Sequence, residues 1–244
     1  MRKLHWSLLK RIYRLRPRYA VYRRLGRRWL LDNRNWVDQQ LIIRRPYEAA
    51  QLGYCRDLLS RYPITHFFDI GANFGLYSVL LSDAPSLQAI EAFEPLPRNM
   101  DQLAANLYLN GLDTRVTTHA LALSDREARM ELFVDAHSTG VSTLNPNGVV
   151  RQASAYDQRI EVSTRPLDSL TGLRDTAILA KVDVEGAELQ VLEGMKGLLA
   201  ANRVWLQIET MPETTDQVAV FMRQLGYRPL QQIGADSYYA KDSA

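Results

Sequence analysis

Short apolar runs alternate with helix-like patterns from about Thr65 to the end of the chain, and this alternation constrains the fold more than any other feature. Five runs have the length and composition of buried strands: HFFDI (66–70), LQAIEAFE (87–94), RVTTHALAL (115–123), AILAKVDV (177–184) and VWLQIE (204–209). Helical patterns separate most of them, at 76–82, 97–110, 187–200 and 215–225. Strands that alternate with helices build βαβ units, so the sequence predicts an α/β fold around a mostly parallel sheet.

One stretch breaks this alternation. Residues 128–166 contain two strand-like pieces, MELFVD and IEVSTRPL, joined by a polar loop with Asn145-Pro146-Asn147-Gly148. We expect an insertion between the third and fourth core strands. Its loop is a candidate lid or substrate-recognition element, and an ordinary surface hairpin explains it equally well.

The charge of the chain is divided very unevenly. Residues 1–45 hold 14 Lys or Arg against Asp32 and Asp38, a net charge of +12, whereas the remainder carries −9. Apolar residues recur every three or four positions from Leu4 to Tyr22, which predicts an amphipathic helix over 3–16 that Pro17 ends. We therefore expect a basic helical arm over residues 1–60 and a catalytic domain over 61–244. The arm can lie on an anionic membrane, contact a second subunit, pack on its own acidic domain or grip nucleic acid.

Composition indicates an ordinary globular protein. The 244 residues are 46% hydrophobic, no stretch reaches the roughly 20 apolar residues of a membrane span, and no signal-peptide pattern is evident. We expect a cytoplasmic protein, with membrane association through the arm as the alternative. The single cysteine, Cys55, excludes an internal disulfide and a multi-cysteine metal site, and we interpret it as a small apolar filler.

A glycine-bearing turn, FFDIGANFGLYS (67–78), follows the first core strand. Asp69, Gly71 and Gly75 stand where the strand gives way to a helix, and a missing β-carbon there lets a ligand approach the main chain. The spacing is not the G-x-G-x-x-G of dinucleotide sites. A binding turn and a purely structural turn both fit this motif.

Polar residues follow the next two strands at the same edge of the predicted sheet. Glu94 ends the second strand, where a carboxylate can accept both hydroxyl hydrogens of a ribose. Ser124 and Asp125 end the third strand, where short polar side chains can receive the amino group of a base. Ligands of open α/β sheets bind at this edge.

The fourth strand carries the densest charge. Alternation places Lys181, Asp183 and Glu185 on one face, and Glu209 ends the fifth strand nearby. Burying such charges for stability alone is unfavourable, which indicates a functional site. Glu188 has an alternative role in the first turn of the following helix, where negative charge is favoured.

The motifs FFDIGANFGLYS, AFEPLPRNMDQLAANLYLNGL, ALSD, STRPLDSL and KVDVEGAELQVLEGM, in this order, resemble the FkbM family of S-adenosylmethionine-dependent methyltransferases. The resemblance spans about residues 65–210 and leaves out the arm. It implies a Rossmann-like methyltransferase fold with a seven-stranded, mostly parallel sheet, in which one antiparallel strand comes from a hairpin in GYRPLQQIGADSYYA. Family members typically methylate hydroxyl groups of sugars or small natural products.

The resemblance also implies roles for individual residues. It places Asp69, Gly71, Asn73 and Gly75 around the methionine part of the cofactor. It gives the ribose to Glu94 and the adenine to Asp125, with Ser124 beside it. Phe74 departs mildly from the family pattern.

Methyl transfer to an alcohol needs a positioned acceptor oxygen and a group that takes its proton. Asp183 is our first choice of base, with Glu185 or Glu209 as substitutes, and Lys181 can stabilise the developing alkoxide or orient Asp183. His137 is a more distant candidate, although a surface histidine explains it more simply. We assign no metal ligand, and Mg²⁺ on Asp183, Glu185 and Glu209 is the less favoured alternative.

Two other functions compete with O-methylation of a glycan or small molecule. An RNA methyltransferase would use the arm on phosphates, but the domain is acidic and lacks both a basic groove interleaved with aromatic residues and an N-P-P-Y motif. A catalytically idle scaffold would keep the fold and use the arm for assembly. The sequence does not identify the acceptor.

Overall fold

The computed structural model describes residues 17–135, 138–145 and 156–241. Its centre is a seven-stranded sheet of order β11-β12-β10-β9-β3-β4-β5. The strands are β3 (His66–Ile70), β4 (Ala89–Phe93), β5 (Val116–His119), β9 (Ala177–Val182), β10 (Arg203–Glu209), β11 (Tyr227–Ile233) and β12 (Asp236–Lys241). The sheet is mixed, because β12 runs antiparallel to β10 and β11 while the other pairs are parallel. The closing segment forms the expected hairpin.

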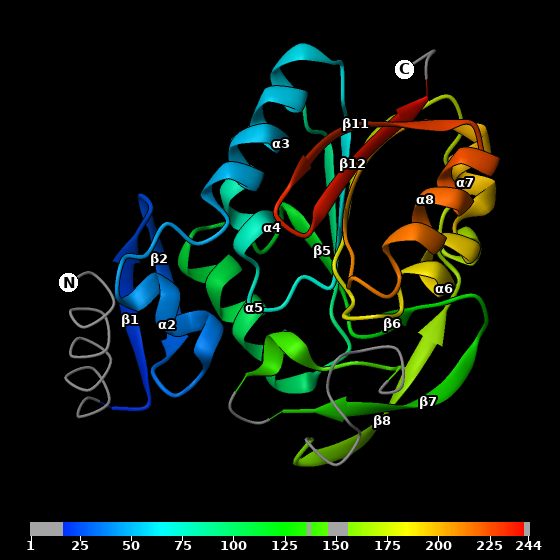
Figure 1. The fold of residues 1–244 in the computed structure, drawn as a ribbon. Coiled ribbons are helices and arrows are strands. Elements are labelled where there is room, and N and C mark those ends of the chain that lie inside the picture. Colours follow the sequence, from blue (N-terminus) through cyan, green and yellow to red (C-terminus); the bar gives the residue numbers. More distant parts are fainter. Residues whose placement is uncertain (1–16, 136–137, 146–155, 242–244) are drawn as a thin grey trace.

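Helices cover both faces of this sheet (Figure 1). α3 (Ala49–Arg61), α4 (Leu76–Leu81) and α5 (Pro97–Leu109) pack on one face, and α6 (Glu188–Glu193), α7 (Lys196–Ala201) and α8 (Thr215–Gln224) on the other. Each face has its own hydrophobic core. Phe67 of β3 packs in the core beneath α3, α4 and α5, and its neighbour Phe68 packs in the core beneath α6, α7 and α8. Among the described residues, no helix combines the length and apolar character needed to cross a bilayer.

The helix expected over 187–200 is two helices, α6 and α7. The carboxylate of Asp168 accepts hydrogen bonds from the Gly197 and Leu198 main-chain N–H groups at 2.7 and 2.8 Å, which caps a new helix start. A β-carbon at Gly194 would lie 2.0 Å from the main-chain oxygen of Ser124. The glycine between α6 and α7 therefore lets the main chain at Ser124 pack closely against it.

The third expected strand, 115–123, is also divided. After β5 the chain leaves the central sheet, and β6 (Ala122–Leu123) pairs with β8 (Gln158–Arg165). β8 also pairs with β7 (Ala128–Val134), which gives a three-stranded sheet of order β6-β8-β7. The predicted strands of the 128–166 insertion are thus present, with the short 3-10 helix η1 (Thr139–Val141) between them. Residues 146–155 of its loop, and His137, lie outside the described residues.

The N-terminal prediction is wrong for residues 19–32, which form an antiparallel hairpin of β1 (Tyr19–Arg24) and β2 (Arg27–Asp32). Leu25 and Gly26 both have positive φ, as a tight hairpin turn requires. Trp29 is fully buried and packs edge-to-face on Phe74, at 5.7 Å between ring centroids. The hairpin, α2 (Trp36–Ile42) and α3 share one core with the sheet, so residues 19–60 belong to the domain. The expected helix over 3–16 lies outside the described residues.

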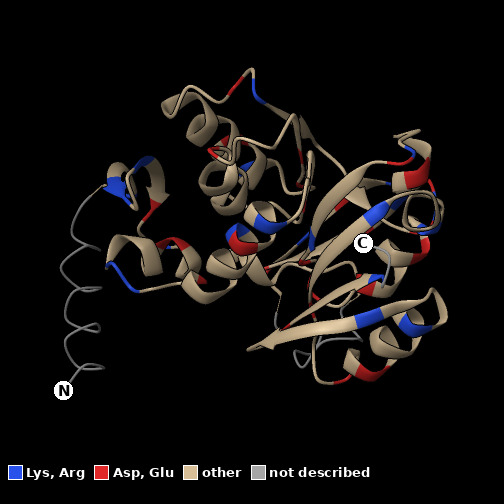
Figure 2. Ribbon diagram, turned by 90° about the horizontal axis from the view of Figure 1, so that it is seen from above, with Lys and Arg blue, Asp and Glu red and all other residues tan. Residues whose placement is uncertain are grey.

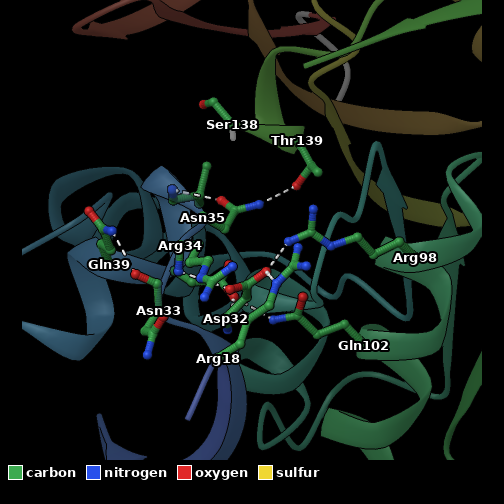
Figure 3. Close-up of polar contacts among 12 residues, drawn as sticks. Arg18, Asp32, Asn33, Arg34, Asn35, Gln39, Arg98, Gln102, Ser138 and Thr139 are labelled. Atoms are coloured by element: carbon green, nitrogen blue, oxygen red, sulfur yellow. Dashed lines mark hydrogen bonds and ion pairs between the residues drawn. The ribbon is translucent and has the colours of Figure 1, made fainter. Parts of the chain in front are cut away.

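A polar network fastens this N-terminal part to α5 and η1 (Figure 3). The buried carboxylate of Asp32 pairs with Arg18 and Arg98. Asp38 accepts hydrogen bonds from the Asp32 main chain at 2.6 Å and from the Gln102 side chain at 2.7 Å. The side chain of Asn35 caps α2 and donates to Thr139 Oγ1 at 2.6 Å. Figure 2 shows basic residues in this N-terminal part and others dispersed over the rest of the fold.

Candidate active site

Two cavities meet at the carboxyl edge of the parallel strands. The narrower lies over the ends of β3 and β4 and is walled by Gly71, Phe93, Glu94 and the segment Leu121–Leu123. The wider opens between the N-terminal segment and the ends of β9, β10 and β12. Both are lined by four of the same residues: Asn73, Gly140, Asp183 and Glu185. A molecule in one cavity therefore faces a molecule in the other across Asp183.

The two turn glycines serve close packing. Gly71 has φ +80°, and a β-carbon there would lie 1.8 Å from the main-chain oxygen of Asp183. Gly75 has φ +91°, and its β-carbon would lie 2.5 Å from Leu103 of α5. Gly71 also lines the narrow cavity, whereas Gly75 does not. The turn is thus structurally required, and one of its glycines also borders the site.

Asp69 lies behind the turn and lines neither cavity. Its Oδ2 accepts hydrogen bonds from the main-chain N–H and the hydroxyl of Ser78, at 2.9 and 2.6 Å, within the first turn of α4. Burial raises the pKa of Asp69, while the charge of Lys181 and the Ser78 bonds oppose that rise. Asp69 therefore stabilises the turn from behind and does not border the space for a ligand.

Glu94 faces the narrow cavity with a fixed carboxylate. Its Oε2 accepts from the Asn73 main chain and its Oε1 from the Leu96 main chain, both at 2.8 Å. Burial raises the pKa of Glu94 to about 7 against the effect of these bonds. The Asn99 side chain also donates a hydrogen bond to this carboxylate. A carboxylate has about four acceptor sites, so the side chain keeps capacity for a ligand's hydroxyl group.

Ser124 and Asp125 are not among the residues that line this cavity. Ser124 is buried and donates to Asp125 Oδ1 at 3.1 Å, and Asp125 also pairs with Arg126. The expectation placed them at the end of a central strand, but they follow β6 in the smaller sheet. Apolar side chains line the cavity in their place: Leu121, Ala122, Leu123, Leu132 and Leu144. Such residues cannot be told from ordinary core residues in a sequence.

Lys181 and Asp183 form the central pair of the site. Lys181 Nζ donates to Asp183 Oδ2 at 2.7 Å and lies 4.8 Å from the ring centroid of Tyr77. Burial lowers the pKa of Lys181, but the charges of Asp183, Glu48 and Asp69 outweigh it and raise that pKa above its ordinary value. The lysine is therefore a charged, buried anchor. The Asp183 side chain stays 20% exposed and faces both cavities.

The other predicted carboxylates divide into two groups. Glu185 lines both cavities and Glu209 lines the wider one. The charge of Asp183, followed by burial, raises the pKa of Glu209 well above its usual range. Glu188 lines neither cavity, and its Oε1 accepts from the Gly186 main chain at 2.7 Å beside the first turn of α6. The helix-start interpretation of Glu188 is thus the one that its geometry favours.

Among the residues of the wider cavity that sequence reasoning missed are Tyr47, Glu48 and Asp236. Asp236 begins β12, where its two oxygens accept from Gln207 at 2.7 Å and Gln51 at 3.1 Å. No sequence motif surrounds these residues. Tyr47 and Glu48 lie in the N-terminal segment and Asp236 in the final hairpin, and the fold places both segments beside the cavity. Within the described ranges, no three or more His, Cys, Asp or Glu side chains are grouped to hold a metal ion.

The family model of the methyltransferase FkbM domain matches residues 69–229. The chain belongs to the FkbM methyltransferase family. This confirms the family expected from the motifs and covers the glycine turn, Glu94 and the Lys181–Asp183 pair.

Relatives and a solved structure agree with this family. The chain is 30% identical over 174 residues to methyltransferase sdnD of Sordaria araneosa, covering 61% of this chain and 67% of the relative. It is 27% identical over 177 residues to methyltransferase 1 of Beauveria bassiana, covering 66% of each chain. The crystal structure of methyltransferase FkbM from Methylobacillus flagellatus KT shares the fold, with a TM-score of 0.52 and 15% identity over 96% of this chain and 57% of that one. The chain thus spans about two thirds of the length of these curated relatives.

Proposed function

We propose that this FkbM methyltransferase transfers a methyl group from S-adenosylmethionine to a hydroxyl oxygen of a sugar, glycan or other small molecule. The observation that carries the proposal is the position of Asp183, which lines both cavities where they meet. A cofactor in the narrow cavity and an acceptor in the wider one would face each other beside this carboxylate. Family membership supports the same reaction class.

The residues of the narrow cavity fit the proposed cofactor. Glu94 offers carboxylate oxygens to ribose hydroxyls, and the slot lined by Leu121–Leu123 suits the flat face of adenine. Gly71 and Asn73 border the part of the cavity next to Asp183, where the methionine portion would lie. When bound, S-adenosylmethionine supplies a methyl group on a positively charged sulfur.

Asp183 is suited to take the acceptor's proton. Lys181 holds its Oδ2 at 2.7 Å, which leaves Oδ1 to accept a hydrogen bond from the acceptor's hydroxyl. As the acceptor oxygen bonds to the methyl carbon, the sulfur–methyl bond would break and S-adenosylhomocysteine would leave, while Asp183 Oδ1 would take the hydroxyl proton and later pass it to water. A positioned base of this kind contributes about 10²–10⁴-fold to the rate. Glu209, with its raised pKa, is a hydrogen-bond donor at neutral pH, and Glu185 remains the alternative base.

The charge of the wider cavity favours an acceptor without phosphates. Five acidic side chains line it among the described residues, Glu48, Asp183, Glu185, Glu209 and Asp236, against one basic residue, Arg45. Even with Glu209 protonated, as its raised pKa implies, acidic groups outnumber the basic one. RNA would bring its phosphate charges toward these carboxylates. Trp36 and Tyr47 also line the cavity and offer apolar ring faces to a sugar ring. These features support a neutral, hydroxyl-rich acceptor.

Labelled S-adenosylmethionine tests the proposal directly. The protein is incubated with cell extract separated into glycan, small-molecule and RNA fractions, beside the Asp183→Asn variant as a control. We expect label in the glycan or small-molecule fraction with the wild type and little with the variant. Label in RNA alone would support the nucleic-acid alternative. We expect activity to survive EDTA, and a loss that Mg²⁺ reverses would assign the carboxylates to a metal.

A further inference from the structure

Ser142 carries a buried hydroxyl in the wall of the narrow cavity. Its Oγ is shielded from solvent and has no hydrogen-bond partner within the ranges of the chain that the structure describes. Buried polar groups in proteins are nearly always paired, because a group that loses its bonds to water must replace them. A hydroxyl of this kind at the edge of a cavity is explained if a bound molecule supplies its partner.

The main chain holds Ser142 in place on both sides. Its N–H donates to the main-chain oxygen of Thr139 at 3.3 Å, at the end of η1. The next residue, Thr143, exchanges two main-chain hydrogen bonds with Phe133 of β7, at 2.9 and 3.0 Å. Ser142 has extended geometry, so its side chain lies on the same side as that of Leu144, and both line the cavity. The hydroxyl is therefore positioned by protein contacts alone.

The other polar side chains of the narrow cavity fall into two groups. One group also lines the wider cavity and so lies where the two meet: Asn73, Asp183 and Glu185. Glu94, Asn99 and Thr139 line the narrow cavity alone, but they have partners. The Asn99 side chain donates to Glu94. Thr139 Oγ1 accepts from Asn35 at 2.6 Å. Among the described residues, Ser142 is thus the side chain that borders this cavity alone with a hydroxyl still to be paired.

The surroundings of Ser142 suit the base of the cofactor. Leu144 packs against the small apolar cluster that contains Leu132, and both line the cavity with the apolar residues that would face adenine. Adenine carries an amino group, and burying it among leucines is unfavourable unless it donates a hydrogen bond. Ser124 and Asp125, expected from the sequence to receive this group, are not in the cavity wall. The hydroxyl oxygen of Ser142 can accept the bond in their place.

We propose that Ser142 Oγ accepts a hydrogen bond from the exocyclic amino group of the bound adenine and makes the cavity selective for that base. This inference rests on the proposed function, because it requires the same cofactor in the same cavity. The proton of the same hydroxyl can turn to a ring nitrogen beside the amino group. A base with hydrogen in place of the amino group leaves the serine oxygen without its donor.

Two nucleosides that differ only in the amino group test the proposal. S-adenosylhomocysteine carries it, and the matching purine analogue carries a hydrogen in its place. Calorimetry measures the dissociation constants of both for the wild type and for Ser142→Ala. Ser163→Ala is the matched control, because Ser163 belongs to the same insertion, is exposed on β8 and lines neither cavity. Urea unfolding of the ligand-free proteins shows whether the substitution disturbs the fold.

We expect the wild type and Ser163→Ala to prefer S-adenosylhomocysteine by about fivefold, the usual contribution of one hydrogen bond between uncharged groups. In Ser142→Ala the preference should disappear, because affinity for S-adenosylhomocysteine falls about fivefold while affinity for the purine analogue changes less than about twofold. The urea midpoint of Ser142→Ala should equal or exceed that of the wild type, since the substitution removes a buried hydroxyl that has no protein partner.

A wild type that binds the two compounds equally well would overturn the proposal, and so would a preference that survives in Ser142→Ala. An equal loss of affinity for both compounds in Ser142→Ala would also overturn it, because that result assigns Ser142 to the shape of the cavity wall. A wild type that binds neither compound would instead remove the proposed cofactor site and with it the proposed function.

Discussion

Asp183 and Glu209 line the same cavity, yet their surroundings suit them to different tasks. Asp183 accepts a hydrogen bond from the buried ammonium of Lys181. For Glu209 the charge of Asp183 and burial dominate, and they raise its pKa. One carboxylate is thus placed to accept a proton and the other to donate a hydrogen bond. The neighbour of Asp183 stands two residues away in the sequence, whereas Glu209 depends on Asp183, which lies on a different strand connection.

Replacing Asp183 tests the role of the base. We expect Asp183→Asn to lower kcat by about 10²–10⁴-fold, because the amide cannot take the acceptor's proton. Affinity for S-adenosylhomocysteine should stay within about twofold, since the substitution is nearly isosteric. Calorimetry and the labelled-methyl assay measure the two effects. Full turnover in the variant would remove Asp183 from the mechanism.

Glu94 predicts a pH dependence of cofactor binding. Its pKa is about 7, and only the ionised carboxylate can accept both ribose hydroxyl hydrogens. Affinity for S-adenosylhomocysteine should therefore be constant above about pH 8 and fall as the pH drops below 7, approaching tenfold per unit. Glu94→Gln should bind more weakly at pH 8 and lose this dependence. Equal pH profiles for the variant and the wild type would contradict the assignment.

Among the elements, the N-terminal hairpin, α2, α5 and η1 act as one support for the cavities. η1 contributes residues to both cavity walls and is tied to α2 through Thr139 and Asn35. At Gly140 a β-carbon would lie 2.7 Å from Val37 of α2. Substitutions in these elements should therefore change the free energy of unfolding and also the shape of the two cavities.

Asp38 predicts how the stability of this support depends on pH. Burial raises its pKa to about 7, against about 3.9 in an unfolded chain. Between these values the folded protein holds a proton that the unfolded chain releases, so the free energy of unfolding falls as pH rises and levels off above about 7. Asp38→Asn should flatten the slope between pH 5 and 6.5 by about 1.4 kcal/mol per unit in urea unfolding. The exposed neighbour Asp101→Asn should keep the wild-type slope, and an unchanged slope in Asp38→Asn would contradict this account.

The bond between Thr139 and Asn35 makes a separate prediction. Thr139→Val leaves a buried N–H of Asn35 without its acceptor, which should cost about 1–3 kcal/mol of unfolding free energy. Urea unfolding measures the loss, with Thr117→Val on the exposed face of β5 as the matched control. Equal stability of the two variants would show that this bond contributes little.

The sequence predicted most elements whose residues interact locally. The strand and helix pattern from β3 to α8 follows apolar periodicity, and the family motifs marked Glu94, Lys181 and Asp183. The hairpin was missed because Tyr19 and Tyr22 also fit a helical repeat, while their partners on β2 decide the structure. Ser124 and Asp125 were misplaced because only tertiary pairing with β8 moves them into the smaller sheet. Glu48 and Asp236 reach the site through contacts that no local pattern contains.

Across the whole molecule, positive charge is concentrated at the start of the chain. The first 16 residues hold six Lys or Arg and no acid, whereas residues 19–60 pack into the domain. We therefore assign the proposed membrane or subunit contact to residues 1–16 and no longer to all of residues 1–45. An anionic lipid surface suits such a composition.

Liposome flotation tests this narrowed proposal. The full chain should float with vesicles that contain anionic lipid and lose that binding at high salt, because Lys and Arg supply the attraction. A chain without residues 1–16 should stay with the soluble fraction, while its cofactor affinity is unchanged. Equal flotation of the two chains would end the membrane proposal for this segment, and gel filtration of both would then test self-association.

The proposed methyl transfer depends most on a nucleoside cofactor bound in the narrow cavity beside Asp183. Calorimetric titration of the wild-type protein with S-adenosylhomocysteine at pH 8 is the most direct measurement of it. We predict saturable binding with one molecule per chain, weakened by Glu94→Gln. Absence of any binding heat, together with no protection of the protein against thermal unfolding, would contradict the cofactor site and the function derived from it.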